Sequence, residues 1–449
     1  MDQIISKNTR VEAFPSLSED LAALKGETYF EVSDPLSFRA KLLEYSRHQE
    51  TVHFVDSSFP TEHRQCYLLA AFGVKDLLET DHSRRAFDLL RKFTDRNSGE
   101  WIFGFLGYDL KNDVEDLSSK NPDELEFPCL HFTVPLTIIY LEEGKVYIKS
   151  AGELPTDVYN QIDSCVPANH SFDPNKIKLI SNPDKSGYLE KITVLLEEIQ
   201  LGNIYEINFC RNLFGKASID PYSTYLSLNK QSPAPFSAFV KQNDKFLLCA
   251  SPERFLKKTG NTLISQPIKG TRKRSDDKVE DGKLINELLN DPKERAENVM
   301  IVDLVRNDLS HTAERGSVQV TELFGVYTFP HVHQLISTVQ STLGLDHHFL
   351  DAIKYCFPMG SMTGAPKLRA MKLIEEHESF RRGLFSGSTG FITPNGNFDF
   401  NVVIRSVLYN ALTNHVSIPT GSAITAECSP EKEWVECELK AKAILSCIR

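Results

Sequence analysis

The sequence predicts an α+β protein in which strand-rich segments are interspersed with helices. Short apolar runs bounded by turn residues recur along the chain, as expected for β-strands. Some longer stretches carry apolar residues at helical spacing, but strands and helices do not alternate in a regular βαβ rhythm. With 449 residues, the chain is long enough for two or three ordinary domains or for one large intertwined domain.

The composition is that of a globular protein, with 41% hydrophobic and 25% charged residues. The net charge of -11 argues against nucleic-acid binding, which needs a basic surface, and against docking on an anionic membrane. The chain begins without a signal-peptide core, and the apolar run at 132–141 is too short to span a bilayer. We therefore expect a cytoplasmic protein that binds neither nucleic acid nor membrane.

Cysteine and histidine usage gives no sign of a disulfide framework or a zinc site. Nine cysteines are scattered without Cys-x-x-Cys spacing, and their number is odd. They are Cys66, Cys129, Cys165, Cys210, Cys249, Cys356, Cys428, Cys437 and Cys447. The histidines between 331 and 348 are irregularly spaced and lack an acidic ligand in register, so we interpret them as ordinary histidines.

The N-terminal segment, residues 1–150, consists of apolar runs separated by turns. The runs that predict strands are 51–55, 101–106, 131–140 and 145–148. Glu142-Glu143-Gly144 predicts a hairpin turn before the last of them. Residues 151–186 are polar and rich in Pro, Asn, Asp and Ser, which predicts a connecting loop to the C-terminal segment, residues 187–449.

Helix signals are clearer in the C-terminal segment. Residues 189–201 carry apolar side chains at helical spacing and are followed by Gly202, a helix-stop residue. Asp291-Pro292 and Ser429-Pro430 each place proline at the first position of a helix, behind a side chain that can cap it. Strands are expected at 245–250 and 262–265.

A hairpin is also expected near the end of the chain. Asn395-Gly396 lies between the strand-like runs 390–393 and 398–409. Alternation along the second run places Arg405 on the face opposite the apolar row that contains Phe398 and Phe400.

Two Glu-x-x-Glu pairs form a candidate cation site. Glu294 and Glu297 share one face of a helix, and Glu433 and Glu436 share a face of the last helix. Taken alone, such pairs are more often solvated helix faces. Apolar residues follow Glu297 and Glu436 at helical spacing, however, so both carboxylates are expected to lean toward apolar faces. Four carboxylates of this kind suit a hard divalent cation.

Lys269 and Glu253 are candidates for the chemistry itself. Lys269 follows an apolar strand, where a lysine is usually a surface charge. A functional lysine there would need burial or a nearby cation to lower its pKa from about 10.4, so that the neutral amine can attack. Glu253 ends a strand at a turn, a position typical of a general acid. These residues indicate an enzyme but name no substrate.

An ordered series of segments between 202 and 443 resembles the chorismate-utilising enzymes. Its members are 202–208, 251–253, 267–272, 294–308, 360–371, 382–390, 403–406 and 421–443, and the first 150 residues match only loosely, through 105–109. The resemblance implies an α+β fold of two large packed β-sheets flanked by helices. It also makes residues 187–449 the chorismate-binding catalytic region, which can form one intertwined domain with the segment before it.

The resemblance implies a site for Mg²⁺ and chorismate. Glu297 and Glu436 match the principal Mg²⁺ ligands, and Glu294 and Glu433 the supporting ones. Arg405 matches the arginine that pairs with the enolpyruvyl carboxylate, a role suited to a bidentate donor. The remaining positions on the substrate side are Thr271, Gln334, Ser361, Phe385, Gly421, Ser422, Ala423 and Lys440.

The residues at two positions distinguish the reactions that these enzymes catalyse. Isochorismate and salicylate synthases carry a water-activating lysine where this chain has Glu206, and anthranilate synthases usually carry alanine where it has Lys269. Aminodeoxychorismate synthases carry lysine at the second position. There it resembles a nucleophile that attacks ring C2 while an acid matching Glu253 protonates the leaving C4 hydroxyl. The resemblance thus favours formation of 4-amino-4-deoxychorismate, for para-aminobenzoate and folate synthesis, from chorismate and ammonia.

The sequence also predicts a source of the ammonia, a further candidate ligand and two alternative functions. The chain shows no glutamine amidotransferase signature, so ammonia is expected from solution or from a separate glutaminase subunit. Pro235 and Phe236 match part of a tryptophan pocket of relatives, which makes tryptophan a candidate ligand. Anthranilate synthase component I is the alternative of the same class. The second alternative function is that of a non-catalytic chorismate-binding relative. It is supported by Gln334, Phe385 and Ala423, where the family has histidine, tyrosine and glycine.

Overall fold

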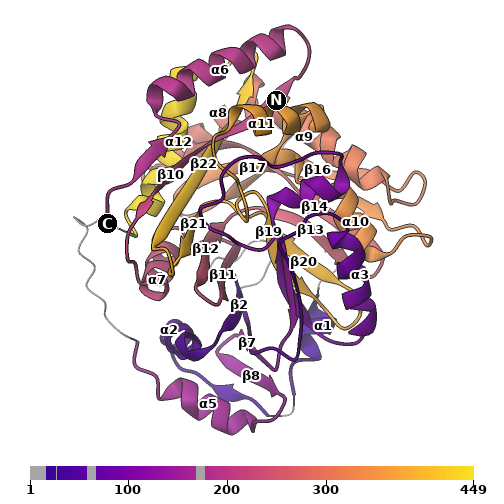
Figure 1. Cartoon of the computed structure of the whole chain (residues 1–449), viewed down its shortest axis with the longest axis vertical. Coiled ribbons are helices and arrows are strands. Elements are labelled where there is room, and N and C mark those ends of the chain that lie inside the picture. The colour runs from indigo at the N-terminus through magenta and orange to yellow at the C-terminus, as the bar shows by residue number, and fades with distance from the viewer. Residues whose placement is uncertain (1–16, 27, 58–66, 168–176, 449) are drawn as a thin grey trace.

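The computed structural model describes residues 17–26, 28–57, 67–167 and 177–448, and two large β-sheets form its centre (Figure 1). Among the described residues, the first sheet has 12 strands and the second has 10. The first contains, in spatial order, β1 (Phe30–Glu31), β8 (Lys145–Ser150), β7 (Thr137–Glu142), β3 (Tyr67–Phe72), β2 (Thr51–Asp56), β11 (Phe236–Gln242), β12 (Lys245–Ser251), β21 (Ser406–Asn410), β22 (His415–Thr425), β10 (Glu206–Lys216) and β18 (Gly364–Ala365), with β9 (Ile180–Asn182) also beside β10. The second contains β15 (Ile268–Lys273), β17 (Val332–Thr342), β14 (Thr262–Gln266), β13 (Arg254–Thr259), β20 (Phe398–Asn401), β19 (Ser388–Ile392), β5 (Ile102–Leu106), β6 (Leu130–Val134) and β4 (Asp76–Thr80), with β16 (Gln319–Thr328) beside β17.

Helices lie around the outside of the sheets (Figure 1). They are α1 (Ser18–Ala22), α2 (Pro35–Tyr45), α3 (Ala86–Arg96), α4 (Lys111–Val114), α5 (Pro155–Asp163), α6 (Lys185–Gln200), α7 (Pro221–Gln231), α8 (Lys278–Asn290), α9 (Pro292–Ser310), α10 (Phe349–Cys356), α11 (Lys367–His377) and α12 (Pro430–Leu445), with 3-10 turns η1 (Ser46–His48), η2 (Tyr108–Leu110) and η4 (Gly360–Met362). The expected α+β fold with two large sheets is confirmed. None of the described helices is long and apolar enough to cross a membrane.

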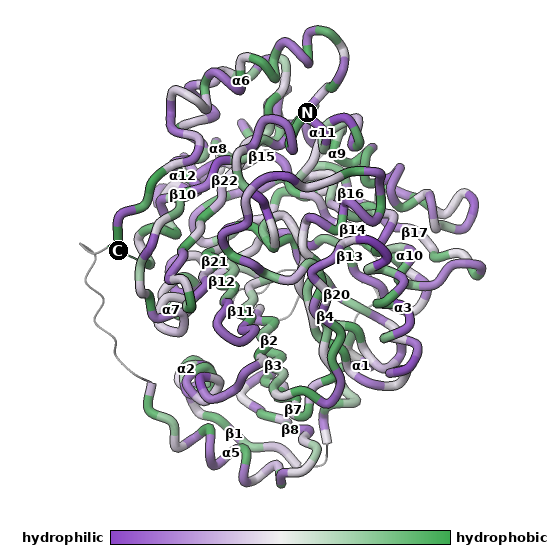
Figure 2. The backbone as a smooth tube through the Cα atoms, viewed as in Figure 1, coloured by the Kyte–Doolittle hydropathy of each residue, from purple (hydrophilic) through white to green (hydrophobic). Residues whose placement is uncertain are grey.

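Both sheets mix strands from early and late in the chain. In the first sheet β2 pairs with β11, and in the second β5 pairs with β19. Side chains from the two sheets meet in one apolar core, for example Val240 and Leu247 of the first with Leu256 and Phe400 of the second. Hydrophobic stretches accordingly follow the central strands, and hydrophilic stretches are frequent on the outer helices and loops (Figure 2).

Turn and cap residues form several of the elements as the sequence predicts. Glu143 and Gly144 have φ of 50° and 75°, the left-handed values that a tight hairpin needs, and β7 pairs with β8. The Asp291 side chain accepts hydrogen bonds from the backbone N–H groups of Lys293 and Glu294, and so caps α9. Ser429 precedes α12 as expected, but its side chain makes no capping hydrogen bond.

The interval 151–186 is not simply a loop. It contains α5 and β9, and Val158 and Ile162 of α5 are buried in a core that also contains Phe38 and Leu42 of α2. Proline at the first position of α5 starts a helix where the polar composition suggested only a connection.

Two long strand predictions were each wrong in the same way. The run 131–140 forms β6 and β7, which lie in different sheets, with Pro135 between them. The run 398–409 forms β20 and β21, again in different sheets. Arg405 lies in the crossing segment with φ of 53°, so strand alternation does not set its direction. The eight described cysteines are free thiols, and Cys66 lies outside the described residues.

Candidate active site

Lys269 joins the two sheets at the centre of the candidate site. It lies on β15, its side chain is nearly buried, and its Nζ donates a hydrogen bond of 2.6 Å to Oε1 of Glu206, the first residue of β10. The side-chain amide of Asn298, on α9, donates to the main-chain oxygen of Lys269 at 3.3 Å. The lysine is thus held at both its backbone and its ammonium group.

The pKa of Lys269 is raised, not lowered. Burial alone would depress it, as expected from the sequence, but the carboxylates of Glu206, Glu297 and Glu253 outweigh burial. In this arrangement the lysine is a paired ammonium, and the depression expected near a bound cation stays a prediction.

Gly270 allows β15 to pass close to α9. Its φ of 97° favours glycine, and a Cβ atom there would lie 3.2 Å from Oε2 of Glu294 and 3.1 Å from the Leu335 side chain. The neighbouring Arg272 binds Glu294 at 3.0 Å, which ties the strand to the start of α9. This packing brings Lys269 close to the Glu-x-x-Glu pair of α9.

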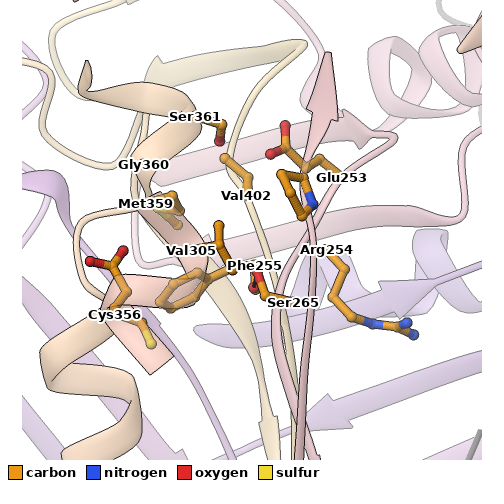
Figure 3. Close-up of a pocket in the computed structure, with 12 residues that line it drawn as sticks. Glu253, Arg254, Phe255, Ser265, Val305, Cys356, Met359, Gly360, Ser361 and Val402 are labelled. Carbon is orange, nitrogen blue, oxygen red and sulfur yellow. Dashed lines mark hydrogen bonds between the residues drawn. The ribbon is translucent and has the colours of Figure 1, made fainter. Parts of the chain in front are cut away.

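Glu253 faces a pocket between β13, α9 and η4. The pocket is lined by Glu253, Ser361, Val305, Val402 and Cys356 among others, with Glu253 and Ser361 toward one end (Figure 3). Burial raises the pKa of Glu253 to about 7, against the opposing effects of the Ser361 hydroxyl and the Lys269 ammonium. A carboxyl with such a pKa carries its proton in part at neutral pH and can act as a general acid.

The two Glu-x-x-Glu pairs face each other across α9 and α12. Nζ of Lys293 lies 3.7 Å from Glu297 and 3.6 Å from Glu433, so one ammonium lies between the two helices. Glu297 and Glu433 are buried, whereas the Glu436 side chain is 48% exposed and pairs with Lys440 at 2.7 Å. The expectation that Glu436 leans toward an apolar face is therefore wrong.

The residues of this carboxylate group fit Mg²⁺ in their chemistry. Oε1 of Glu297 is buried without a hydrogen-bond partner, and burial raises the pKa of Glu297 to about 7. Burial and the neighbouring Glu436 also raise the pKa of Glu433. As the side chains stand, no three Asp, Glu, His or Cys groups among the described residues are close enough to hold a metal, and Lys293 is the ammonium that lies beside carboxylates of both helices. Buried carboxyls whose negative charge is poorly compensated would gain from a divalent cation, which lowers their pKa and binds them as carboxylates.

Anion-binding groups border the carboxylates. Arg405 is only partly exposed and forms no ion pair with any described carboxylate, although the charge of Glu436 acts on it. Lys440 donates to the main-chain oxygen of Gly421 at 2.8 Å, and Ser422 Oγ lies 2.9 Å from the Tyr188 hydroxyl. An arginine of this kind can pair with a carboxylate of a ligand.

The other residues predicted on the substrate side differ in their exposure and in their contacts. Thr271 is exposed and pairs in register with Gln334, whose buried Oε1 has no hydrogen-bond partner. Ala423 pairs with Asn208 on β10. Phe385 is almost fully buried in the apolar core.

Pro235 and Phe236 lie at a second pocket, separate from the carboxylates. It is also lined by Arg254, Tyr327 and Phe329, and the Arg254 guanidinium stacks 4.8 Å from the Phe236 ring centre. Tryptophan binding there stays a prediction.

Glu206 and Lys293 are site residues that sequence reasoning missed. Glu206 served only to exclude other reactions, although an acidic residue in a strand is rarely buried without a partner. Lys293 lies four residues before Glu297 on one helix, a spacing that predicts an ion pair.

Comparisons with known proteins agree with this geometry. The family model described as "chorismate binding enzyme" matches residues 45–446. The chain is 33% identical over 359 residues to anthranilate synthase component 1 of Thermus thermophilus, covering 77% of each chain. It is 32% identical over 367 residues to aminodeoxychorismate synthase component 1 of Bacillus subtilis, covering 79% of this chain and 77% of the relative. It is 40% identical over 265 residues to aminodeoxychorismate synthase component 1 of Escherichia coli, covering 59% of this chain and 58% of the relative.

Solved structures share the fold. Anthranilate synthase component I of Streptococcus pneumoniae superimposes with a TM-score of 0.74 at 23% identity, over 86% of this chain and 93% of the other. The menaquinone-specific isochorismate synthase MenF of Escherichia coli gives a TM-score of 0.72 at 17% identity, over 96% and 99%. With the family match over most of its length, the chain belongs to the chorismate binding enzyme family.

Proposed function

We propose that this protein is an aminodeoxychorismate synthase, which converts chorismate and ammonia to 4-amino-4-deoxychorismate. The observation that supports it most is the placement of Lys269, whose ammonium is buried among Glu206, Glu297 and Glu253. A lysine in this position, near a carboxyl that carries its proton in part at neutral pH, suits covalent catalysis at a ring carbon.

The chemistry would proceed in two substitutions. Nζ of Lys269, as a neutral amine, forms a bond to ring C2 while the double bonds shift and the C4–O bond breaks. Glu253 gives its proton to the leaving hydroxyl, which departs as water. Ammonia then forms a bond to C4, the double bonds shift back, and the C2–Nζ bond breaks. The proton that the new amine sheds returns to Glu253.

Binding would rest on the charged groups around these two residues. Arg405 would pair with one carboxylate of chorismate, because it is only partly exposed and lacks a described carboxylate partner. Mg²⁺, held by Glu297 and Glu436 with Glu294 and Glu433 in support, would supply the countercharge for the ring carboxylate.

A separate glutaminase subunit would supply the ammonia. The relatives from Bacillus subtilis and Escherichia coli are both named component 1, which supports a partner component for this chain too. The second candidate function is that of anthranilate synthase component I, because the relative from Thermus thermophilus is about as similar as the one from Bacillus subtilis.

Product analysis tests the proposal. The purified chain is incubated with chorismate, Mg²⁺ and ammonium, and the products are separated and identified by mass spectrometry. We expect 4-amino-4-deoxychorismate without pyruvate. Anthranilate with pyruvate would establish the second candidate, and bound but unconsumed chorismate would indicate a non-catalytic relative.

A further inference from the structure

Glu206 and Lys269 form a buried ion pair that bridges the two sheets. Glu206 is 2% exposed and Lys269 is 9% exposed, and the two side chains are 2.6 Å apart. Among the residues that the structure describes, Glu206 is the side chain that accepts a hydrogen bond from Nζ of Lys269. An ammonium has no lone pair, so Lys269 cannot attack carbon until this proton leaves.

We propose, building on the function proposed above, that Glu206 is the base that takes the Nζ proton of Lys269 and returns it when the amine is released. The transfer runs along an existing hydrogen bond and turns an ion pair into a neutral pair, with no change in net charge. A low-dielectric site favours such a neutral pair more than water does.

Other carboxylates face Lys269 but are less suited to this task. Glu253 lies between β12 and β13, Glu297 on α9 and Glu436 on α12, and their charges act on the lysine. None of the three accepts a hydrogen bond from Nζ. Glu253 favours its protonated form, which suits a donor, and Glu297 and Glu436 lie beside the ammonium groups of Lys293 and Lys440.

The proton balance of the cycle closes with this assignment. Glu206 accepts one proton as Lys269 becomes a neutral amine, and the C2–Nζ bond then forms. While the adduct exists, its nitrogen is a secondary ammonium and Glu206 stays protonated. When the C2–Nζ bond breaks, the amine departs neutral and takes back the proton from Glu206. In the same cycle Glu253 protonates the leaving C4 oxygen and takes a proton from the incoming nitrogen. The two carboxyls therefore have separate roles.

The first test compares the pH profile of turnover in wild-type protein and Glu206→Gln. Without the base, Lys269 must lose its proton to solvent, so we expect turnover to fall about 100-fold near neutral pH and to climb as pH rises. The wild-type profile should lack this climb. Glu206→Asp keeps a carboxylate and should recover part of the rate, while Glu280→Gln, an exposed position on α8, should match wild type.

The second test needs no turnover. Lys269 is labelled with an amine-acylating reagent over a range of pH, with the exposed Lys283 in the same digest as the reference. Glu206 holds the lysine charged, so Glu206→Gln should label Lys269 at least about 10-fold faster at mildly alkaline pH, which corresponds to one pKa unit. Faster labelling combined with slower turnover is the signature of a base, because loss of a merely structural contact would lower turnover equally at all pH.

The outcomes separate this inference from the function on which it rests. If the wild-type chain forms 4-amino-4-deoxychorismate and Glu206→Gln keeps both its rate and its pH profile, the role of Glu206 is refuted while the function stands. If the wild type forms anthranilate instead, the proposed function fails. Unchanged labelling of Lys269 in Glu206→Gln would then still refute the pairing independently.

Discussion

The ammonium of Lys293 lies 3.6 Å from the carboxylate of Glu433, and so joins α9 to α12 across the candidate metal site. The same ammonium lies 3.7 Å from Glu297. A single positive charge therefore offsets two buried carboxylates, which a divalent cation could do in its place.

Replacement of Lys293 by glutamine should weaken the metal-free protein and strengthen its response to Mg²⁺. We expect a loss of about 1 kcal/mol in unfolding free energy, because the lysine side chain is partly exposed. Thermal unfolding with and without Mg²⁺ measures both effects. An equal Mg²⁺ response in variant and wild type would contradict a shared site.

Replacement of Glu297 by glutamine should abolish turnover while the fold survives. Each carboxylate removed takes a charged ligand from a cation that needs several oxygens, so we expect a loss of at least about 100-fold. Glu436→Gln should behave in the same way, although its side chain is exposed. Titration of Mn²⁺ or Mg²⁺ by calorimetry checks binding separately from activity. Near-normal activity of both variants at low Mg²⁺ would mean that these carboxylates do not hold the metal.

Glu253→Gln should change stability in a pH-dependent way. The folded-state pKa of Glu253 is about 7, above the ordinary carboxyl value, so its contribution to stability is present in acid and is lost as pH rises through about 7. The metal-free variant should therefore equal wild type near about pH 4 and exceed it by about 3 kcal/mol near about pH 8. Denaturant unfolding at the two pH values measures the difference. The same difference at both would show that burial does not raise this pKa.

Glutamine should not replace ammonium for the purified single chain. The chain lacks a glutaminase signature, so glutamine-dependent turnover should appear only after a glutaminase subunit is added. The comparison uses equal concentrations of glutamine and ammonium. Glutamine-dependent product from the single chain, free of contaminating glutaminase, would contradict the expected partner.

The sequence predicted the elements with strong local signals and misjudged those that depend on the crossing between sheets. Asp291-Pro292 and the Glu143-Gly144 turn act through neighbouring backbone atoms, so their structures follow from local chemistry. The crossings at Pro135 and Arg405 depend on which sheet has room for the next strand, and alternation alone cannot show this.

The candidate site also contains residues that local spacing predicts and contacts that it cannot predict. The helical spacing of Glu294 and Glu297 could be read from the sequence, but the approach of Glu206 to Lys269 joins residues 63 positions apart in different sheets. The direction of the lysine pKa depended on that unseen partner, since burial without it would have lowered the pKa.

The Lys269→Ala variant should turn over slowly and should still bind Mg²⁺ and chorismate. Glu297, Glu436 and Arg405 would still hold Mg²⁺ and chorismate, because they are separate from the nucleophile. The space left by the lysine would admit ammonia or water to C2, so a C2-substituted product is expected in small amount. Product analysis and chorismate titration distinguish lost chemistry from lost binding.

The most direct measurement of the central claim is mass spectrometry of the wild-type protein quenched after mixing with chorismate and Mg²⁺ in the absence of ammonia. With no ammonia to displace the lysine, a ring adduct equal to chorismate minus water should accumulate on the peptide that contains Lys269. Lys269→Ala should show no adduct. An adduct-free wild type, together with a Lys269→Ala variant that forms 4-amino-4-deoxychorismate at the wild-type rate, would mean that the lysine only binds and that ammonia attacks the ring directly.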